Sequence, residues 1–270
     1  MIMILHPFFN WVGSKKAYVT ELERFCPKQF DPLTSTYFEP FLGTGSLLLF
    51  LQPTKAYVSD ADATVALAFQ CMKGSSQQVK DILMKIYEEP DLSKTYAALC
   101  ENFNALSSVQ KTAALIFISK HSYGSIFRFT ADGTRLIRNW RGHRRGMNWL
   151  NFERVAHYLK SPSINVAHAS FESVLSRAKK GDFVFLDPPY INVRKQYSRY
   201  YKHNDVSLDD LAYVMNKLDE MGCFVLLINC EEPALTGKIP QFKRKGFRAW
   251  EKFVGAKEAR KESIFTNYLL

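Results

Sequence analysis

Residues 37–51 read YFEPFLGTGSLLLFL, and this stretch sets the fold class that we expect for the chain. Its first five residues are mostly apolar and predict a short strand. The two glycines that follow predict a tight turn, and the run SLLLFL predicts the start of a buried helix. A strand that runs through a glycine turn directly into a helix is how an α/β unit begins.

The same alternation of short apolar strands and helices returns along the chain. Strands are predicted at residues 55–59, 182–186 and 223–229, and a helix at 208–221 has Ser207 as its N-cap. Short buried strands that alternate with helices are typical of a parallel sheet with helices on its faces. We therefore expect an α/β fold built on a parallel sheet.

A long helical and turn-rich stretch interrupts this alternation. The apolar spacing predicts helix over residues 63–89 and again over 91–120, whereas residues 121–149, with four glycines, predict irregular structure. The interruption covers about residues 72–158. We expect it to be an inserted domain.

The composition is that of a globular protein with a polyanionic partner. Of the 270 residues, 47% are hydrophobic and 23% charged, which excludes a disordered or fibrous chain. The formal net charge of +10 favours nucleic acid or an anionic membrane as partner. No apolar run approaches the roughly 20 residues of a spanning helix, so we expect no membrane association. Five scattered cysteines without a CxxC pair indicate reduced thiols in a cytoplasmic protein.

Most of the positive charge lies between residues 120 and 160. Nine basic residues there face only Asp132 and Glu153, so this stretch carries +7 of the total. Arginine supplies forked donors for phosphates and guanine edges, and aromatic rings can stack on bases. A solvated charged loop is the alternative, but the prevalence of arginine and the interleaved aromatics favour nucleic-acid contact. The expected contact residues are Arg128, Arg135, Arg138, Arg141 and Arg144.

The glycine turn and the acid after the second strand indicate an adenosine-type ligand. The turn lets the backbone approach a ligand at the carboxyl end of the sheet. Asp60 follows Gly43 by 17 residues, close to the ~20-residue offset at which a carboxylate binds ribose hydroxyls. Leu48 stands where the dinucleotide pattern GxGxxG has its third glycine, so that pattern is incomplete. Asp62 remains an alternative to Asp60.

Residues 187–190, Asp-Pro-Pro-Tyr, follow the apolar strand 182–186 and carry the catalytic chemistry that we expect. Two prolines fix the backbone and remove two N–H donors, so carbonyl oxygens can face a ligand. Asp187 and the Pro188 carbonyl can accept the two hydrogens of a planar exocyclic amine while Tyr190 stacks on its ring. An ordinary turn would explain the prolines but not the carboxylate beside an aromatic ring. The catalytic candidates are Asp187, Pro188, Pro189 and Tyr190.

These motifs, in their order along the chain, resemble the Dam-type (D12 class) adenine-N6 DNA methyltransferases. Residues 8–15 (FFNWVGSK) resemble that family's N-terminal motif, 39–46 its glycine motif and 187–190 its catalytic tetrapeptide. Asp60 stands at its ribose-binding acid, and residues 266–268 resemble its C-terminal ending. The resemblance covers nearly the whole chain.

The resemblance implies S-adenosylmethionine as the cofactor. The six histidines are scattered without metal-ligand spacing, so we expect no metal. Trp11 and Lys15 would bind the cofactor, with Lys15 at its carboxylate, and Phe171 would pack against its adenine. The implied cofactor-binding residues are Trp11, Lys15, Glu39, Phe41, Gly43, Gly45, Asp60, Phe171 and Asp187.

The resemblance also implies a domain organisation and partners. Residues 1–71 and 159–270 would form a catalytic domain with a Rossmann-like methyltransferase sheet. Residues 72–158 would form an inserted, mainly helical target-recognition domain that binds double-stranded DNA. The chain would be a cytoplasmic, DNA-associated monomer of prokaryotic, phage or viral origin, with a dimer on DNA left open.

The implied reaction transfers a methyl group to N6 of an adenine flipped out of a short DNA site, with GATC as one candidate. The chain departs from the family at residues 135–142 (RLIRNWRG), beside the part that resembles its recognition hairpin. Three alternatives stay open: a cytosine-N4 methyltransferase, an RNA adenine methyltransferase, and a catalytically inactive DNA-binding relative.

Overall fold

The computed structural model of the chain describes residues 4–125, 127–142, 146–189, 206–230, 233–250 and 260–269. Two residues predicted as functional, Arg144 and Tyr190, lie outside these ranges. The chain divides into two compact units. The first unit comprises Met1–Val19, Gly43–Gln52 and Asp62–His168, and the second comprises Thr20–Leu42, Pro53–Ala61 and Ala169–Leu270. The predicted domain boundaries after residues 71 and 158 stay a prediction.

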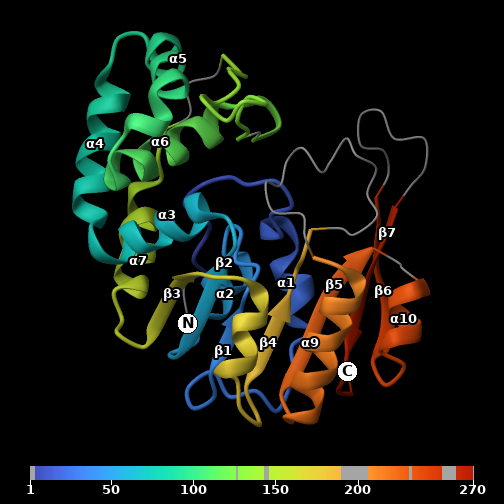
Figure 1. Cartoon of the computed structure of the whole chain (residues 1–270). Helices are drawn as coiled ribbons and strands as arrows, with labels where there is room; N and C mark the ends of the chain where they lie inside the picture. Colours follow the sequence, from blue (N-terminus) through green and yellow to red (C-terminus); the bar gives the residue numbers. More distant parts are fainter. Residues whose placement is uncertain are drawn as a thin grey trace. The chain divides into compact units, whose positions relative to one another are not determined.

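The described part of the chain forms one seven-stranded, mostly parallel sheet in the order β3-β2-β1-β4-β5-β7-β6 (Figure 1). Its strands are β1 (Tyr37–Glu39), β2 (Ala56–Asp60), β3 (Ile164–His168), β4 (Phe183–Leu186), β5 (Phe224–Cys230), β6 (Lys243–Trp250) and β7 (Arg260–Thr266). β1 pairs in parallel with β2 and β4, and β4 pairs in parallel with β5. The predicted α/β class, a Rossmann-like sheet, is confirmed.

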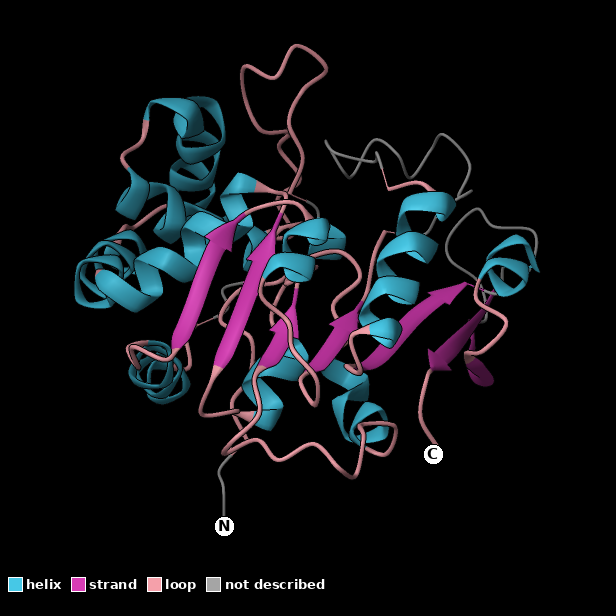
Figure 2. Ribbon diagram, turned by 60° about the horizontal axis from the view of Figure 1, so that its bottom comes forward, coloured by secondary structure: helices cyan, strands magenta, loops and turns pink. Residues whose placement is uncertain are grey.

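The sequence predicts a parallel sheet, and in the described sheet β7 departs from it. β7 pairs antiparallel with both β5 and β6, so β6 runs in the same direction as β5 (Figure 2). The sequences of β6 and β7, KRKGFRAW and RKESIFT, begin with charged residues and contain no apolar run of more than two residues. They therefore lack the continuous apolar signal that the central strands give. β1 and β4, in contrast, are buried at every position.

Helix α9 (Leu208–Glu220) covers the centre of the sheet in the second unit (Figure 1). Its N-cap is Ser207, as predicted, whose hydroxyl accepts a hydrogen bond from the Asp210 amide at 3.0 Å. The buried face of α9 packs in one core cluster with residues of β4 and β5. The members from these three elements are Val184, Leu186, Leu211, Ala212, Val214, Met215, Leu218, Val225 and Leu227. Two shorter helices are also described, α1 (Val19–Glu23) and α10 (Pro233–Lys238).

The first unit is mainly helical. Its helices are α2 (Ser46–Leu51), α3 (Ala63–Gly74), α4 (Ser76–Glu88), α5 (Leu92–Asn102), α6 (Ser108–His121) and α7 (Trp149–Leu159). Short 3-10 turns occur at Lys16–Tyr18, Phe103–Ala105 and Tyr123–Ser125, and at Phe171–Ser176 in the second unit. No helix in the described ranges is long and apolar enough to cross a membrane.

Two predicted long helices are each split in the structure. The helix expected over 63–89 breaks at Ser75, and the one expected over 91–120 breaks between α5 and α6. At the second break Ser107 forms a capping box, because its hydroxyl accepts from the Gln110 amide and the Gln110 side chain accepts from the Ser107 amide. Gly74 lies directly before the first break, in the polar stretch 73–78 (KGSSQQ), whereas the second break has no glycine or proline.

Residues 121–141, apart from residue 126, form an irregular hairpin, which we call the arginine hairpin. Its arms are joined at Ser122–Trp140 and Phe129–Leu136, and Ile137 N donates to Arg128 O at 2.7 Å. Gly133 at the tip has φ +72°, a conformation that glycine adopts freely. The prediction of irregular structure agrees with the absence of a regular strand in its described residues.

Candidate cofactor and nucleic-acid sites

The carboxyl end of β1 places a buried carboxylate at the edge of the sheet. Glu39 is the last residue of β1 and only 3% exposed, and its Oε2 accepts a hydrogen bond from the Tyr37 hydroxyl at 2.8 Å. Three residues later the Leu42 amide donates to Ser59 O of β2 at 3.0 Å. The start of the glycine turn is therefore tied to the neighbouring strand.

Three predicted cofactor residues converge beside this edge. The Ala169 amide donates to Asp60 O at the end of β2, at 3.2 Å, which brings the following Phe171 close to the strand end. The Phe171 ring stacks on that of Phe41, with centroids 5.1 Å apart. A flat aromatic wall next to a carboxylate suits a planar base joined to a ribose.

Asp62, the alternative to Asp60, caps a helix. It is the N-cap of α3, and its Oδ1 accepts from the Thr64 amide at 2.8 Å. The carboxylate of Asp60 belongs to the last residue of β2 and is half-buried. The geometry therefore favours Asp60 as the ribose acid.

The Asp-Pro-Pro motif follows β4, as the sequence predicts. Pro188 is buried, and Asp187 and Pro189 are half-buried. Phe38 of β1 pairs with Val184 of β4, so Glu39, the next residue of β1, is level with Phe185 of β4. Asp187 follows Phe185 by two residues. In the order β3-β2-β1-β4-β5, the strand order reverses between β1 and β4. In open α/β sheets, ligands bind at this topological switch point.

In the first unit, three hydroxyl groups join the N-terminal motif to the glycine turn. Ser14 Oγ lies 2.9 Å from Thr44 Oγ1 and 3.3 Å from Ser46 Oγ, and the last two lie 2.8 Å apart. The motifs did not predict this cluster, although small polar residues occur in both of them. Gly43 and Gly45 have φ +47° and +62°, so both need the freedom of glycine.

The two predicted cofactor residues of the N-terminal motif differ in their surroundings. Lys15 is only 6% exposed, and its ammonium donates to Gly13 O at 3.3 Å. The Trp11 ring is half-buried and lies 5.7 Å from the Phe127 ring of the arginine hairpin. Trp11 therefore connects the N-terminal motif with the hairpin.

Two predicted DNA-binding arginines share one acidic partner. Arg135 and Arg138 donate to the same oxygen, Oε2 of Glu101, at 3.1 and 3.0 Å, and all three side chains are about half exposed. The hydrogen bonds from Arg135 and Arg138 lower the pKa of Glu101. Glu101 lies on α5, so counting charges along residues 120–160 could not find it. Arg141 is exposed and Arg128 is half-buried.

The C-terminal segment that resembles the family's ending braces the sheet. The Asn267 side chain accepts from the Val225 amide and donates to Cys223 O, both at 2.8 Å. The Tyr268 hydroxyl donates to Phe25 O at 2.7 Å. These contacts fix the start of β5, at the opposite end of the strand from its carboxyl edge. In the described ranges, His, Cys, Asp and Glu side chains do not gather into a group that could bind a metal ion.

Comparison with known proteins identifies one family. The model of the D12 class N6 adenine-specific DNA methyltransferases matches residues 11–253. The type II methyltransferase M1.LlaDCHI of Lactococcus lactis subsp. cremoris is 25% identical, over 98% of this chain and 96% of its own length. The type II methyltransferase M.MjaIII of Methanocaldococcus jannaschii is 25% identical, over 88% of each chain. A DNA adenine methylase of Salmonella typhi is 21% identical, over 85% of this chain and 82% of its own.

Proposed function

The chain belongs to the D12 class of N6 adenine-specific DNA methyltransferases, and on this premise we propose that it transfers a methyl group from S-adenosylmethionine to N6 of an adenine flipped out of a short DNA site. One observation supports this most directly. The Phe41–Phe171 wall, Asp60 and Asp187 all lie at the carboxyl ends of the adjacent strands β2, β1 and β4 or in the segments that follow.

The residues of the second unit fit the adenosine part of this cofactor. Asp60 would accept hydrogen bonds from the ribose hydroxyls, and the wall of Phe41 and Phe171 would pack against the adenine. The carboxylates of Glu39 and Asp187 favour a cationic group at the same edge. When bound, the cofactor supplies an electrophilic methyl group on a positively charged sulfur.

The remaining cofactor-binding residues of the proposal, Trp11, Lys15, Gly43 and Gly45, belong to the first unit. The buried ammonium of Lys15 would pair with a carboxylate. Gly43 and Gly45 leave the turn without side chains, so its backbone can approach a ligand. Trp11 would add an apolar contact.

The chain's own contribution to the chemistry centres on Asp187. Its carboxylate and the Pro188 carbonyl would accept the two N6 hydrogens, which holds the amine in one orientation and makes its lone pair available for attack. Pro189 would stiffen the loop, and Tyr190 would stack on the flipped base. No covalent enzyme intermediate is needed, so the rate would come from positioning and from electrostatics at the amine.

The arginine hairpin would bind the DNA. Arg128, Arg135, Arg138 and Arg141 would contact phosphates or base edges, together with Arg144. We assign residues 72–158 to target recognition, and residues 1–71 and 159–270 to catalysis. Because residues 135–142 depart from the family's sequence, GATC is one candidate site among others. The chain would act as a cytoplasmic monomer, with a dimer on DNA still open.

One experiment tests the reaction, the base and the site together. The protein is incubated with labelled S-adenosylmethionine and a plasmid from cells that lack adenine methylation, and the methylated bases are mapped by sequencing. We expect N6-methyladenine at one short recurrent site. The variant Asp187→Ala should bind the plasmid as the wild type does but transfer no methyl group. Methylated cytosine, methylation of RNA alone, or full activity of the variant would contradict the proposal, and an inactive wild type would favour the inactive relative.

A further inference from the structure

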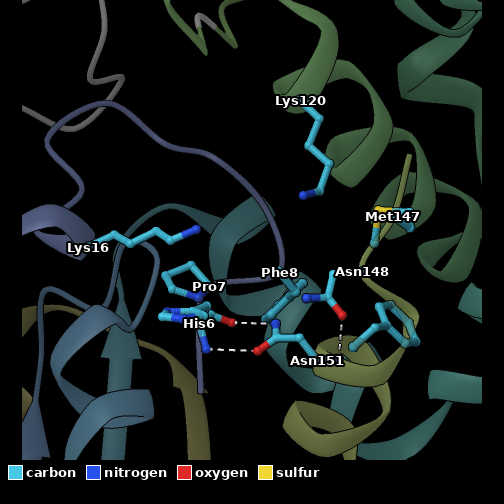
Figure 3. A pocket seen from close by; sticks show the side chains of 9 residues that line it. His6, Pro7, Phe8, Lys16, Lys120, Met147, Asn148 and Asn151 are labelled. Atoms are coloured by element: carbon cyan, nitrogen blue, oxygen red, sulfur yellow. Dashed lines mark hydrogen bonds between the residues drawn. The ribbon is translucent and has the colours of Figure 1, made fainter. Parts of the chain in front are cut away.

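A small basic pocket of about 80 Å³ lies in the first unit, apart from the residues assigned above (Figure 3). The residues of its lining that matter here are His6, Phe8, Lys16, Lys120, Asn148 and Asn151. Figure 3 shows the side chains of Lys16 and Lys120 reaching toward the cavity from two sides. None of the described lining residues is acidic.

One wall of the pocket is held in place by a hydrogen-bonded side chain. Asn151 Oδ1 accepts from the His6 amide, and Asn151 Nδ2 donates to His6 O, both at 2.9 Å. The Asn151 amide in turn donates to Asn148 Oδ1 at 3.0 Å, which caps α7. The chain around His6 is thereby fixed to the first turn of α7, so the pocket has a defined shape.

The electrostatics of the pocket suit an anion. Lys16 and Lys120 bring two positive charges, and the N-terminus of the 11-residue helix α7 adds a partial positive charge. Partial burial and the charge of Lys16 lower the pKa of His6, which agrees with a positive potential there. A phosphate group, with several oxygens to accept from ammonium, amide and imidazole donors, matches this lining.

The position of the pocket in the chain points to the source of the phosphate. Lys120 immediately precedes the arginine hairpin, and Asn148 follows it by seven residues. The pocket therefore lies where both arms of the hairpin join the helices of the first unit. We propose that this pocket binds one phosphate of the DNA backbone next to the site that the arginine hairpin recognises. This inference rests on the proposed function.

The first test compares a variant that replaces both pocket lysines by glutamine with a variant that replaces one exposed lysine elsewhere by glutamine. Lys16→Gln/Lys120→Gln removes the charges of the pocket, and Lys94→Gln removes that of a lysine on α5 that is 88% exposed and lies outside the pocket. Duplex affinity is measured by fluorescence anisotropy over a series of salt concentrations. The double variant should bind about tenfold more weakly, and its log–log salt slope should be smaller by about one. Lys94→Gln should bind as the wild type does.

The second test locates the phosphate. A set of duplexes carries one neutral methylphosphonate linkage each, moved along the methylated site. We expect one position where the neutral linkage weakens wild-type binding but leaves the double variant unaffected. Equal sensitivity of both proteins at every position, or an unchanged affinity of the double variant, would overturn the proposal.

A third measurement separates DNA from free phosphate. Inorganic phosphate is titrated while the His6 imidazole is followed by NMR. If the double variant loses phosphate binding but keeps its DNA affinity, the ligand is free phosphate and the DNA assignment is wrong. Methylation by the wild type is measured on the same duplexes. Intact methylation with a failed pocket test overturns only the pocket, whereas a wild type that neither binds nor methylates DNA overturns both proposals.

Discussion

The rings of Phe41 and Phe171 stack with their planes 24° from parallel, although the two residues lie on opposite sides of the helical bundle in the sequence. The contact forms because Ala169 is hydrogen-bonded to the end of β2. It joins the loop after β1 to the loop before β4. These loops carry the residues that we expect to bind adenosine.

The first prediction concerns this aromatic pair. Phe41→Leu keeps an apolar side chain and removes the stacking ring, so S-adenosylmethionine should bind about threefold to tenfold more weakly in calorimetry. Duplex affinity should not change. Phe30→Leu is the matched control, because Phe30 is also half-buried and packs against Phe183 in the same unit. Equal cofactor affinity in both variants would remove Phe41 from the cofactor site.

The second prediction separates the two neighbouring aspartates. Asp60→Asn should lower cofactor affinity at least tenfold, since it weakens the acceptor for two ribose hydroxyls, while the unfolding midpoint stays close to that of the wild type. Asp62→Ala should do the opposite. It removes the cap of α3 and should lower the free energy of unfolding by about 1 kcal/mol in urea titrations, with cofactor affinity preserved. An exchange of these two outcomes would make Asp62 the ribose acid.

The third prediction concerns Glu101, which joins Arg135 and Arg138. Glu101→Gln adds one net positive charge and weakens the contact that orients both guanidinium groups. Binding to unrelated duplex should become tighter and more salt-dependent, and the ratio of target to unrelated affinity should fall about threefold to tenfold. The control Glu88→Gln removes an exposed charge at the end of α4. If it lowers the ratio equally, Glu101 acts only through net charge.

The fourth prediction concerns alkaline pH. Burial raises the pKa of the Cys223 thiol from 9.0 to about 12. Below pH 9 the thiol is protonated in the folded and the unfolded chain. Between pH 9 and 12 only the unfolded chain loses the proton, so the free energy of unfolding should fall as pH rises. Urea titrations at pH 7.5, 9 and 10.5 should show a shallower fall for Cys223→Ala than for the wild type, and parallel curves would refute this origin.

The central strands could be predicted from sequence because each is buried on both faces and reads as an apolar run. Such runs at 182–186 and 223–229 lie within one residue of β4 and β5 at each end. β6 and β7 could not be predicted in this way, because neither strand contains an apolar run of more than two residues. The break at Ser75 had a signal in the polar stretch 73–78 (KGSSQQ), but Met72 and Val79 are seven residues apart and so keep a helical spacing across it.

The candidate site was predictable where motifs follow strands directly. Asp60 and Asp187 could be placed at the sheet edge because parallel strands end on the same side. The choice between Asp60 and Asp62 needed the Thr64 amide, which spacing alone does not reveal. Glu101 could not be found, since 34 residues separate it from Arg135.

The strand order has a consequence for how the chain is made. Of the described strands, β7 comes last along the chain, yet it lies between β5 and β6. β6 leaves the ribosome before β7, its described neighbour in the sheet, so the second unit can close only after residues 260–266 have been synthesised. Until then, the edge of β5 at Leu227 and Ile228, which pairs with Phe265 and Ile264 in the folded sheet, is unpaired on the nascent chain. A product truncated before residue 260 should therefore be a substrate for chaperones and proteases rather than a shortened enzyme.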